Sequence, residues 1–137
     1  MVSKQFPPTD PRAWLRRAQS NLTHAKTRTP GVELEVLLFN AQQSAEMAIK
    51  AVFIVQGFVF PYVHDLAELL RRLDHAGVDI PLAVREASQL TRYALTTRYP
   101  YVGDPATENN YSAALAIAEA VVAWAAERIC PDAPAPR

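Results

Sequence analysis

The sequence predicts an all-α fold, a compact up-and-down bundle of about five antiparallel helices. Apolar residues recur at intervals of three and four over five separate stretches, as they do on one face of an amphipathic helix. The 11 prolines fall near the chain ends or between these stretches, as expected of a residue that breaks helices. No stretch shows the alternation of a half-buried strand. We expect one bundle domain at residues 11–129, an N-terminal extension at residues 1–10 and a proline-rich tail at residues 130–137.

The first two predicted helices have clear boundary signals. Asp10 can cap a helix over residues 11–26, and Pro11 suits its first position. The second helix covers residues 32–56, and Gly57 is a typical stop signal. Their expected buried residues are Trp14, Ala18, Leu22 and Ala25 in the first helix, and Leu34, Leu37, Leu38, Ala41, Ala45, Ala48, Val52 and Val55 in the second.

The third and fourth predicted helices are shorter. Asp65 and Glu68 open the third and resemble a capping box with aspartate as the cap, and Gly77 ends it. The fourth follows Pro81 and ends near Tyr99, because the residue before a proline disfavours helical geometry. Their apolar faces comprise Leu66, Leu69, Leu70 and Leu73, and then Leu82, Val84, Ala87, Leu90, Ala94 and Leu95.

The last predicted helix covers residues 108–129, with Thr107 as its cap. It is rich in alanine, which lets neighbouring helices approach closely. The connections between all five helices are short, which favours antiparallel packing of most neighbours. Its expected buried stripe is Tyr111, Leu115, Ala118, Val121, Val122, Ala125 and Ile129.

Composition limits the function classes. Lysine plus arginine and aspartate plus glutamate number 14 each, so affinity for nucleic acid cannot come from bulk positive charge, although a local basic site is allowed. The single cysteine, Cys130, cannot form an intrachain disulfide, and no metal-type spacing or glycine-rich phosphate loop occurs. The N-terminus lacks a signal-peptide core, and no apolar run could span a membrane. We expect a cytoplasmic protein without cofactor, metal or membrane contact.

Three motifs occur in order along the chain. The first is "NAQQSAEMAIKA" at residues 40–51, the second is "HDLAELL" at residues 64–70, and the third is "TTRYP" at residues 96–100. Together they resemble the signatures of the HEPN (higher eukaryotes and prokaryotes nucleotide-binding) domain family, over about residues 14–129. The resemblance implies a bundle of about five helices, often a homodimer, and in prokaryotes frequently encoded beside a minimal nucleotidyltransferase.

Some branches of that family are toxins that cleave RNA without a metal, through an R-x4-6-H motif near the start of the last helix. Here the positions where that histidine should follow Arg98 hold Gly103, Asp104 and Pro105, none of which can exchange a proton as imidazole does. Met47 also stands where the second-helix signature usually has lysine. The sequence therefore resembles a branch without the usual catalytic histidine.

Arg98 and Tyr99 are the first candidate ligand contacts. The Arg98 guanidinium can bind a phosphate through two hydrogen bonds, and the Tyr99 ring can stack on a base or ribose. The structural alternative is that Arg98 binds helix-end carbonyls or an acidic side chain, and that Tyr99 fills a gap beside Pro100. The structural role is the favoured one.

His64, Lys50, Gln43 and Glu46 are the other candidates. His64 precedes a helix N-terminus, which favours anions, and with Lys50 it can hold a phosphate. Alternatively, His64 is the residue just before the cap and packs on Leu69, as in a hydrophobic staple. Gln43, Glu46 and Lys50 share a polar strip, which a solvated face, or intramolecular hydrogen bonds to the loop after the fourth helix, would also explain. Asp65 and Glu68 are sufficiently explained as caps.

Two functions follow from the motifs, and a third needs no ligand. The favoured one is a non-catalytic module that binds nucleotide, RNA or protein, as the partner of a minimal nucleotidyltransferase in a toxin–antitoxin-type pair. The alternative is a metal-independent RNase toxin with a non-standard catalytic set, such as Arg98 with His64. The third is an interaction subunit whose polar residues only stabilise its own bundle.

Overall fold

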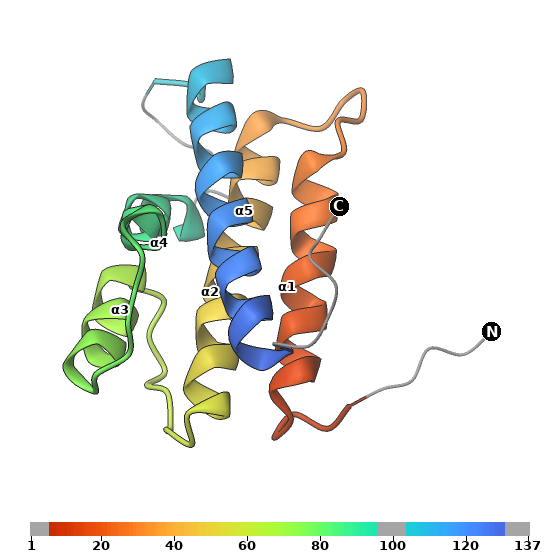
Figure 1. The fold of residues 1–137 in the computed structure, drawn as a ribbon. Coiled ribbons are helices and arrows are strands. Elements are labelled where there is room, and N and C mark those ends of the chain that lie inside the picture. Colours follow the sequence, from red (N-terminus) through yellow and green to blue (C-terminus); the bar gives the residue numbers. More distant parts are fainter. Residues whose placement is uncertain (1–5, 96–103, 131–137) are drawn as a thin grey trace.

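The computed structural model describes residues 6–95 and 104–130, and every regular element within them is a helix (Figure 1). In chain order these are α1 (Pro11–Lys26), α2 (Leu34–Val55), α3 (Leu66–His75), α4 (Leu82–Arg85), the 3₁₀ helix η1 (Glu86–Leu95) and α5 (Glu108–Ile129). The predicted all-α class is confirmed, and the predicted bounds of α1 and α5 match the observed ones.

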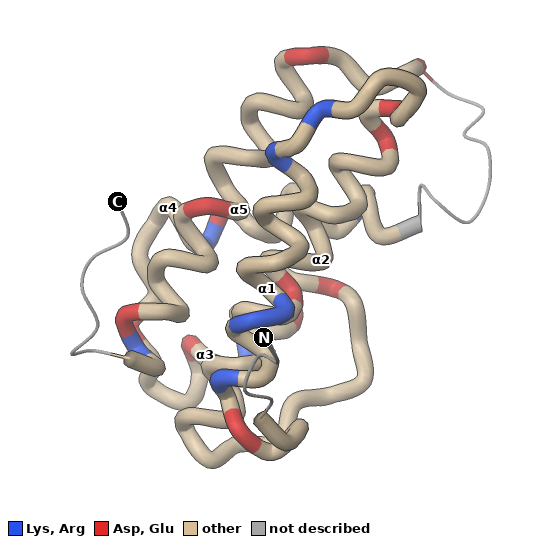
Figure 2. The backbone as a smooth tube through the Cα atoms, turned by 90° about the vertical axis from the view of Figure 1, so that its right-hand side faces the viewer, with Lys and Arg blue, Asp and Glu red and all other residues tan. Residues whose placement is uncertain are grey.

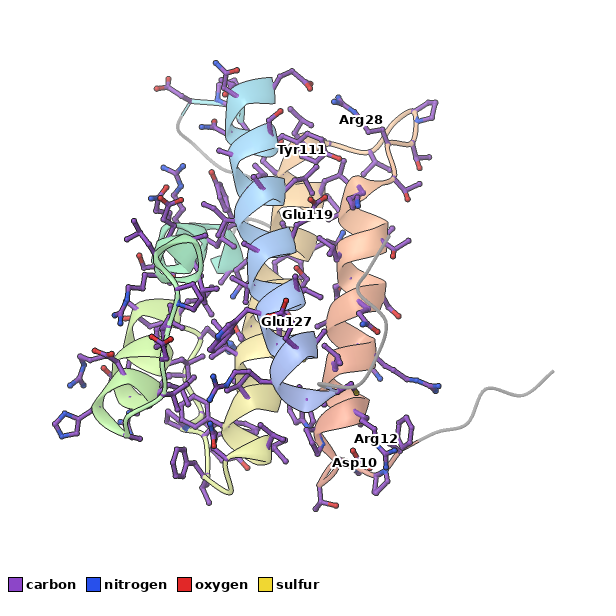
Figure 3. The ribbon with its side chains drawn as sticks, in the orientation of Figure 1. Asp10, Arg12, Arg28, Tyr111, Glu119 and Glu127 are labelled. Carbon is purple, nitrogen blue, oxygen red and sulfur yellow. The ribbon has the colours of Figure 1, made fainter. Side chains whose placement is uncertain are left out.

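The three long helices α1, α2 and α5 stand side by side, and α3 with the α4–η1 segment forms a second group beside α2 and α5 (Figure 1). α1 and α2 are antiparallel because only residues 27–33 connect them. The hydroxyl of Tyr111, in the first turn of α5, donates a 2.6 Å hydrogen bond to the Ala25 carbonyl at the end of α1 (Figure 3). α5 therefore runs antiparallel to α1. It runs parallel to α2, because α3 and α4–η1 return the chain between the end of α2 and the start of α5.

Side chains cap the helices where the sequence predicted caps. The Asp10 carboxylate accepts from the Arg12 amide at 2.9 Å, and the Thr107 hydroxyl accepts from the Asn110 amide at 3.1 Å. The Asn110 side chain returns a bond by accepting from the Thr107 amide at 3.0 Å, which completes a capping box. After α2, Gly57 has a positive φ of 77°, a conformation that glycine adopts without steric cost.

The predicted fourth helix differs from the observed one. It is α-helical for only one turn and continues as the 3₁₀ helix η1 to Leu95, and Tyr99 lies outside the described residues. A 3₁₀ helix has three residues per turn, so residues three apart share a face. The buried side chains follow that spacing; they are Val84, Ala87, Leu90 and Tyr93. Leu82, expected to be buried, is 77% exposed.

α2 is the centre of the core. Between Leu37 and Phe53 all its side chains are buried except Phe39, Gln43 and Met47, which are partly exposed. A helix that is covered on nearly all sides must bury any polar residue it carries, and such residues need hydrogen-bond partners. The buried polar residues of the described chain all lie on this helix: Asn40, Gln42, Ser44, Glu46 and Lys50.

The described helices carry both basic and acidic residues. Basic and acidic residues are interspersed over the described part of the chain (Figure 2), in line with their equal totals of 14. None of the described helices combines the length and apolar character that a membrane span requires.

Candidate functional site

The structure brings four of the six predicted ligand contacts together. Gln43, Glu46 and Lys50 on α2 and His64 before α3 lie around the carboxylate of Glu46. The other two, Arg98 and Tyr99, fall outside the described residues, as does the rest of the "TTRYP" motif.

The Glu46 carboxylate is almost fully buried, with 2% of the side chain exposed. Gln42, four residues earlier, donates to Oε1 at 2.8 Å, and Lys50, four residues later, donates to Oε2 at 2.9 Å. Residues four apart on a helix are neighbours on its surface, so α2 itself places all three groups in line. Gln43 extends the network by donating to the Gln42 side-chain oxygen at 2.8 Å.

His64 completes the network from another part of the chain. Its Nδ1 lies 3.0 Å and 3.1 Å from the two carboxylate oxygens of Glu46. An ionised carboxylate only accepts hydrogen bonds, so Nδ1 carries the proton and donates. The His64 side chain is nevertheless 62% exposed, and its Nε2 makes no hydrogen bond within the described chain. A buried carboxylate thus orients an imidazole whose second nitrogen is open to solvent.

The ionisation of Glu46 follows from its surroundings. Burial raises the pKa of Glu46, but hydrogen bonds from Lys50, Gln42 and His64, with the positive charge of Lys50, outweigh burial. The net result is a pKa below the ordinary glutamate value, so Glu46 is ionised at neutral pH.

Lys50 differs from its predicted environment. Its side chain is only 8% exposed, its ammonium group is paired with Glu46, and it lies 5.2 Å from the centre of the Phe60 ring. The interpretation as a solvated face is therefore wrong for Glu46 and Lys50, whereas Gln43 is partly exposed. Most of the loop after the fourth helix, to which these residues could also bond, lies outside the described residues. The side chains that pack against α2 exclude water from the Glu46–Lys50 pair. A ligand would therefore meet a positive charge that Glu46 already neutralises.

Asp65 and Glu68 are structural groups. The Asp65 carboxylate accepts from the Ala67 amide at 3.0 Å and caps α3. Glu68 is instead held by Arg71 and Arg72, with bonds of 2.7 Å and 3.0 Å to its Oε1. Of the predicted capping box, only the hydrogen bond to the Asp65 side chain is therefore present.

The segment between α2 and α3 adds aromatic residues to the network. The Phe60 ring packs edge-on against Trp14 and Tyr62, with ring centroids 5.0 Å and 6.4 Å apart. Tyr62 is 97% exposed and stands two residues before His64. Phe60 and Tyr62 were not predicted from the sequence, although the apolar "FVFPYVH" at residues 58–64 is an unusual composition for a surface connection.

The segment that carries His64 is fixed at its end. The Leu66 amide donates to the Thr91 hydroxyl of η1 at 3.0 Å, and Leu66 is fully buried. His64 is thus held between α2, which supplies Glu46, and the start of α3, which η1 supports.

Comparisons with known proteins decide the family. The model of the family described as "HEPN domain" matches residues 11–129. The chain belongs to the HEPN domain family. A crystal structure of TT1696 from Thermus thermophilus is similar, with a TM-score of 0.74, 32% identity and coverage of 86% of this chain and 97% of the other. A crystal structure of ST0689, described as an archaeal HEPN homologue, has a TM-score of 0.70 and 25% identity, with coverages of 88% and 98%. No curated protein sequence matches the chain.

The R-x4-6-H motif, through which HEPN toxins cleave RNA, has no histidine at its expected positions in this chain. Two of the positions where the R-x4-6-H histidine is expected hold Asp104 and Pro105, both exposed, and the third, Gly103, is outside the described residues together with Arg98. Among the described residues, no group of three or more histidine, cysteine, aspartate or glutamate side chains could hold a metal ion. The one imidazole that the described structure pairs with a carboxylate is His64.

Proposed function

We propose that this HEPN domain is a module that binds a nucleotide or single-stranded RNA, and that His64 and Tyr62 form its contact surface. The observation that carries the proposal is the orientation of His64. Its Nδ1 is fixed by the buried Glu46, while its Nε2 and the Tyr62 ring are open to solvent. An exposed side chain that is already held in one orientation loses less conformational entropy when a ligand binds. Such preorganisation is typical of residues in binding sites.

The two exposed side chains suit different parts of a nucleotide. A base can stack on the Tyr62 ring, since stacking on aromatic side chains is the usual way in which unpaired bases are bound. A protonated His64 donates through both ring nitrogens, so Nε2 can donate to a phosphate while Nδ1 stays bound to Glu46. Lys50 and Gln42 support this surface by fixing the Glu46 carboxylate. Arg98 is a further proposed contact.

The test is the affinity for a fluorescent single-stranded oligoribonucleotide, measured by anisotropy. His64→Asn keeps an amide donor near the position of Nδ1 and removes Nε2, so it separates ligand binding from support of Glu46. We expect affinity to fall about tenfold, as for loss of one charge-assisted hydrogen bond. His75→Asn is the matched control, because His75 is exposed at the other end of α3. Equal affinities for wild type and both variants would exclude His64 from the binding surface.

Arg98→Ala and Tyr62→Ala test the rest of the proposal in the same assay. Loss of affinity in Tyr62→Ala supports base stacking, with Val59→Ala as control because Val59 is 94% exposed in the same segment. Affinity that is unchanged in Arg98→Ala removes that arginine from the surface.

The second candidate function is metal-independent RNA cleavage. The pairing of Glu46 with His64 favours it, because a carboxylate that fixes one imidazole nitrogen prepares the other for proton transfer. Cleavage also needs a cation near the phosphate, and we propose Arg98 for that role. RNA that is cut by wild type in the presence of a chelator, but not by His64→Asn, would establish this activity. Intact RNA, together with normal growth when the protein is overproduced, would reject it.

The proposed assembly is a cytoplasmic homodimer that partners a minimal nucleotidyltransferase in a toxin–antitoxin-type pair. This assembly is supported by what is frequent in the HEPN family, whose members are often homodimers and, in prokaryotes, frequently encoded beside a minimal nucleotidyltransferase. Light scattering at micromolar concentration is expected to give twice the monomer mass of 15.2 kDa. Co-purification with a nucleotidyltransferase encoded by a neighbouring gene tests the partner, and a monomer that elutes without it would contradict the assembly.

A further inference from the structure

The outer face of α1 is an exposed polar surface on which no described element packs. α1 packs against α2 and α5, which cover its apolar side (Figure 1). On its opposite side lies an open depression of about 730 Å³. Six exposed residues line this depression: Arg16, Gln19, Ser20, Thr23, His24 and Thr27. This side of α1 is therefore accessible to a partner.

The lengths of the side chains shape the depression. Ser20 and Thr23 have short side chains and stand about one turn apart in its middle. The side chains of Arg16, Gln19 and His24, which line the rest of it, are longer. Short side chains let a neighbouring helix approach closely, because its ridges can enter the groove above them. From its first to its last residue the depression extends about 16 Å along α1, which is the length of a helix of three turns.

Two hydrogen-bond donors on this face have no partner in the part of the chain that the structure describes. They are the side chains of Arg17 and His24, which are both exposed. The two residues are seven positions apart, so they share a face of the helix and lie about 10 Å apart along its axis. His24 has an N–H to donate whether or not its ring is charged. The face therefore presents two uncommitted donors at a separation of two turns.

The charge on α1 is basic only. The helix contains arginine, lysine and histidine but no aspartate or glutamate, and it faces the viewer in Figure 2. Near its two ends, Arg12 pairs with Asp10 at 2.7 Å and Lys26 pairs with Glu119 at 3.1 Å. Arg17 has no such carboxylate within the described ranges. The middle of the outer face consequently keeps an excess of positive charge.

We infer that this face of α1 is a docking surface for an acidic helix of a protein partner. A carboxylate of the partner helix pairs with Arg17, and a second one, two turns along, accepts from His24. The backbone of the partner helix lies over the short side chains of Ser20 and Thr23. Exposed ion pairs contribute little each, so the complex is weak and depends on salt.

The same features make two other ligands less suitable for this face. Affinity for a phosphate backbone depends on the number of free cations, and Arg12 and Lys26 are already paired. The depression also has no aromatic side chain on which an unpaired base could stack. A second copy of this chain does not fit either, because none of its described helices carries two unpaired carboxylates two turns apart.

The experiment is an NMR titration of the full chain with a synthetic, alanine-rich helical peptide that has glutamates seven residues apart. The control ligand has glutamine in place of each glutamate. We expect the glutamate peptide to shift the amide signals of Arg17, Ser20 and His24, and the shifts to weaken as salt screens the charges. No shift at millimolar peptide, or equal shifts with the glutamine peptide, overturns the inference. If a single-stranded oligoribonucleotide shifts these signals and the glutamate peptide does not, the face binds nucleic acid and the inference is also overturned.

Substitutions on α1 separate charge from shape. Arg17→Gln should weaken binding of the glutamate peptide about threefold, as for loss of one exposed ion pair. Arg71→Gln removes the same charge from an exposed position on α3 and is the control. Ser20→Met fills the depression without changing the charge and should weaken binding about tenfold, whereas Ser20→Ala keeps the depression and should bind as wild type does. Equal effects of Arg17→Gln and Arg71→Gln, or of the two Ser20 variants, would show unspecific attraction and reject the docking surface.

The inference goes beyond the proposed function, because it requires neither the His64 surface nor the identity of the partner. Peptide binding on α1 without any dependence of RNA affinity on His64 overturns the proposed RNA contact and leaves the docking surface standing. RNA affinity that depends on His64, with no response of α1 to the glutamate peptide, overturns only the docking surface.

Discussion

At the middle of α2, the Glu46 carboxylate and the Lys50 ammonium group are both withdrawn from water. Their side chains are 2% and 8% exposed, and their atoms lie 2.9 Å apart. Removing one member of a buried ion pair leaves the other charge without compensation, which costs more than the pair contributes. We therefore expect Glu46→Gln to lower the free energy of unfolding by about 3 kcal/mol, measured by urea denaturation.

Glu68→Gln is the matched control for that substitution. Glu68 is also bound by two basic side chains, but its partners Arg71 and Arg72 are exposed. Ion pairs at a surface contribute little because water and salt screen them. The control should leave unfolding nearly unchanged, and equal losses in both variants would show that burial of Glu46 has no energetic consequence.

The lowered pKa of Glu46 predicts how stability responds to acid. Because the pKa in the folded state lies below the ordinary value of 4.5, the unfolded chain takes up this proton at higher pH than the folded protein does. The stabilisation is complete above the unfolded pKa and is lost as the pH falls through the folded pKa. As the pH falls from neutral to below 4.5, the difference in unfolding free energy between wild type and Glu46→Gln should shrink. A difference that stays constant over this range contradicts the assignment.

The sequence predicted part of the Glu46 network. The spacing of Glu46 and Lys50 identified them as neighbours, and the "HDL" motif placed His64 directly before a capped helix. Their burial could not be predicted, because it depends on Phe60 and the chain around it folding back over α2. The Gln42 contact was missed for the same reason, since a solvated helix face would not have required it.

At the scale of single elements, helix ends were predicted best because their signals are local. Thr107 illustrates this: its hydroxyl accepts from the Asn110 amide only three residues away. Thr107→Ala should lower the free energy of unfolding by about 1 kcal/mol, the usual effect of losing such a cap. Chemical denaturation measures it, with Thr29→Ala as control, since Thr29 is exposed between α1 and α2. No change in Thr107→Ala would mean that other groups satisfy the start of α5.

The α4–η1 segment was the element that was predicted least well. The predicted apolar face of this segment follows an α-helical period. It includes Leu82 and does not include Tyr93. The spacing of three from Val84 through Tyr93 was the available signal, and it indicates a 3₁₀ helix. A 3₁₀ helix has poorer hydrogen-bond geometry, so packing of those four side chains against the bundle must support it. That support is a tertiary effect, which local propensity does not contain.

At the scale of the whole molecule, contacts between distant parts of the sequence join α1 to α5. Arg28 donates to the Glu108 carboxylate at 2.5 Å and 2.8 Å across 80 residues, and its guanidinium lies 5.1 Å from the Tyr111 ring centre. Farther along α5, Glu119 pairs with Lys26 at 3.1 Å (Figure 3). The sequence predicted both helices within their observed bounds, but no local pattern identifies which residues meet when they pack. The antiparallel arrangement of α1 and α5 rests on such contacts.

Among these contacts, the Tyr111 hydroxyl is the buried one, and its removal measures the link between α1 and α5 directly. It donates to the Ala25 carbonyl at 2.6 Å, across 86 residues of chain. Tyr111→Phe keeps the ring and its packing but leaves a carbonyl at the end of α1 without this donor, so we expect a loss of about 1 kcal/mol in unfolding free energy. Tyr62→Phe is the matched control, because Tyr62 is 97% exposed and should show no loss. If the two variants unfold alike, water replaces the Tyr111 hydroxyl at no cost, and the packing of apolar side chains alone holds the two helices together.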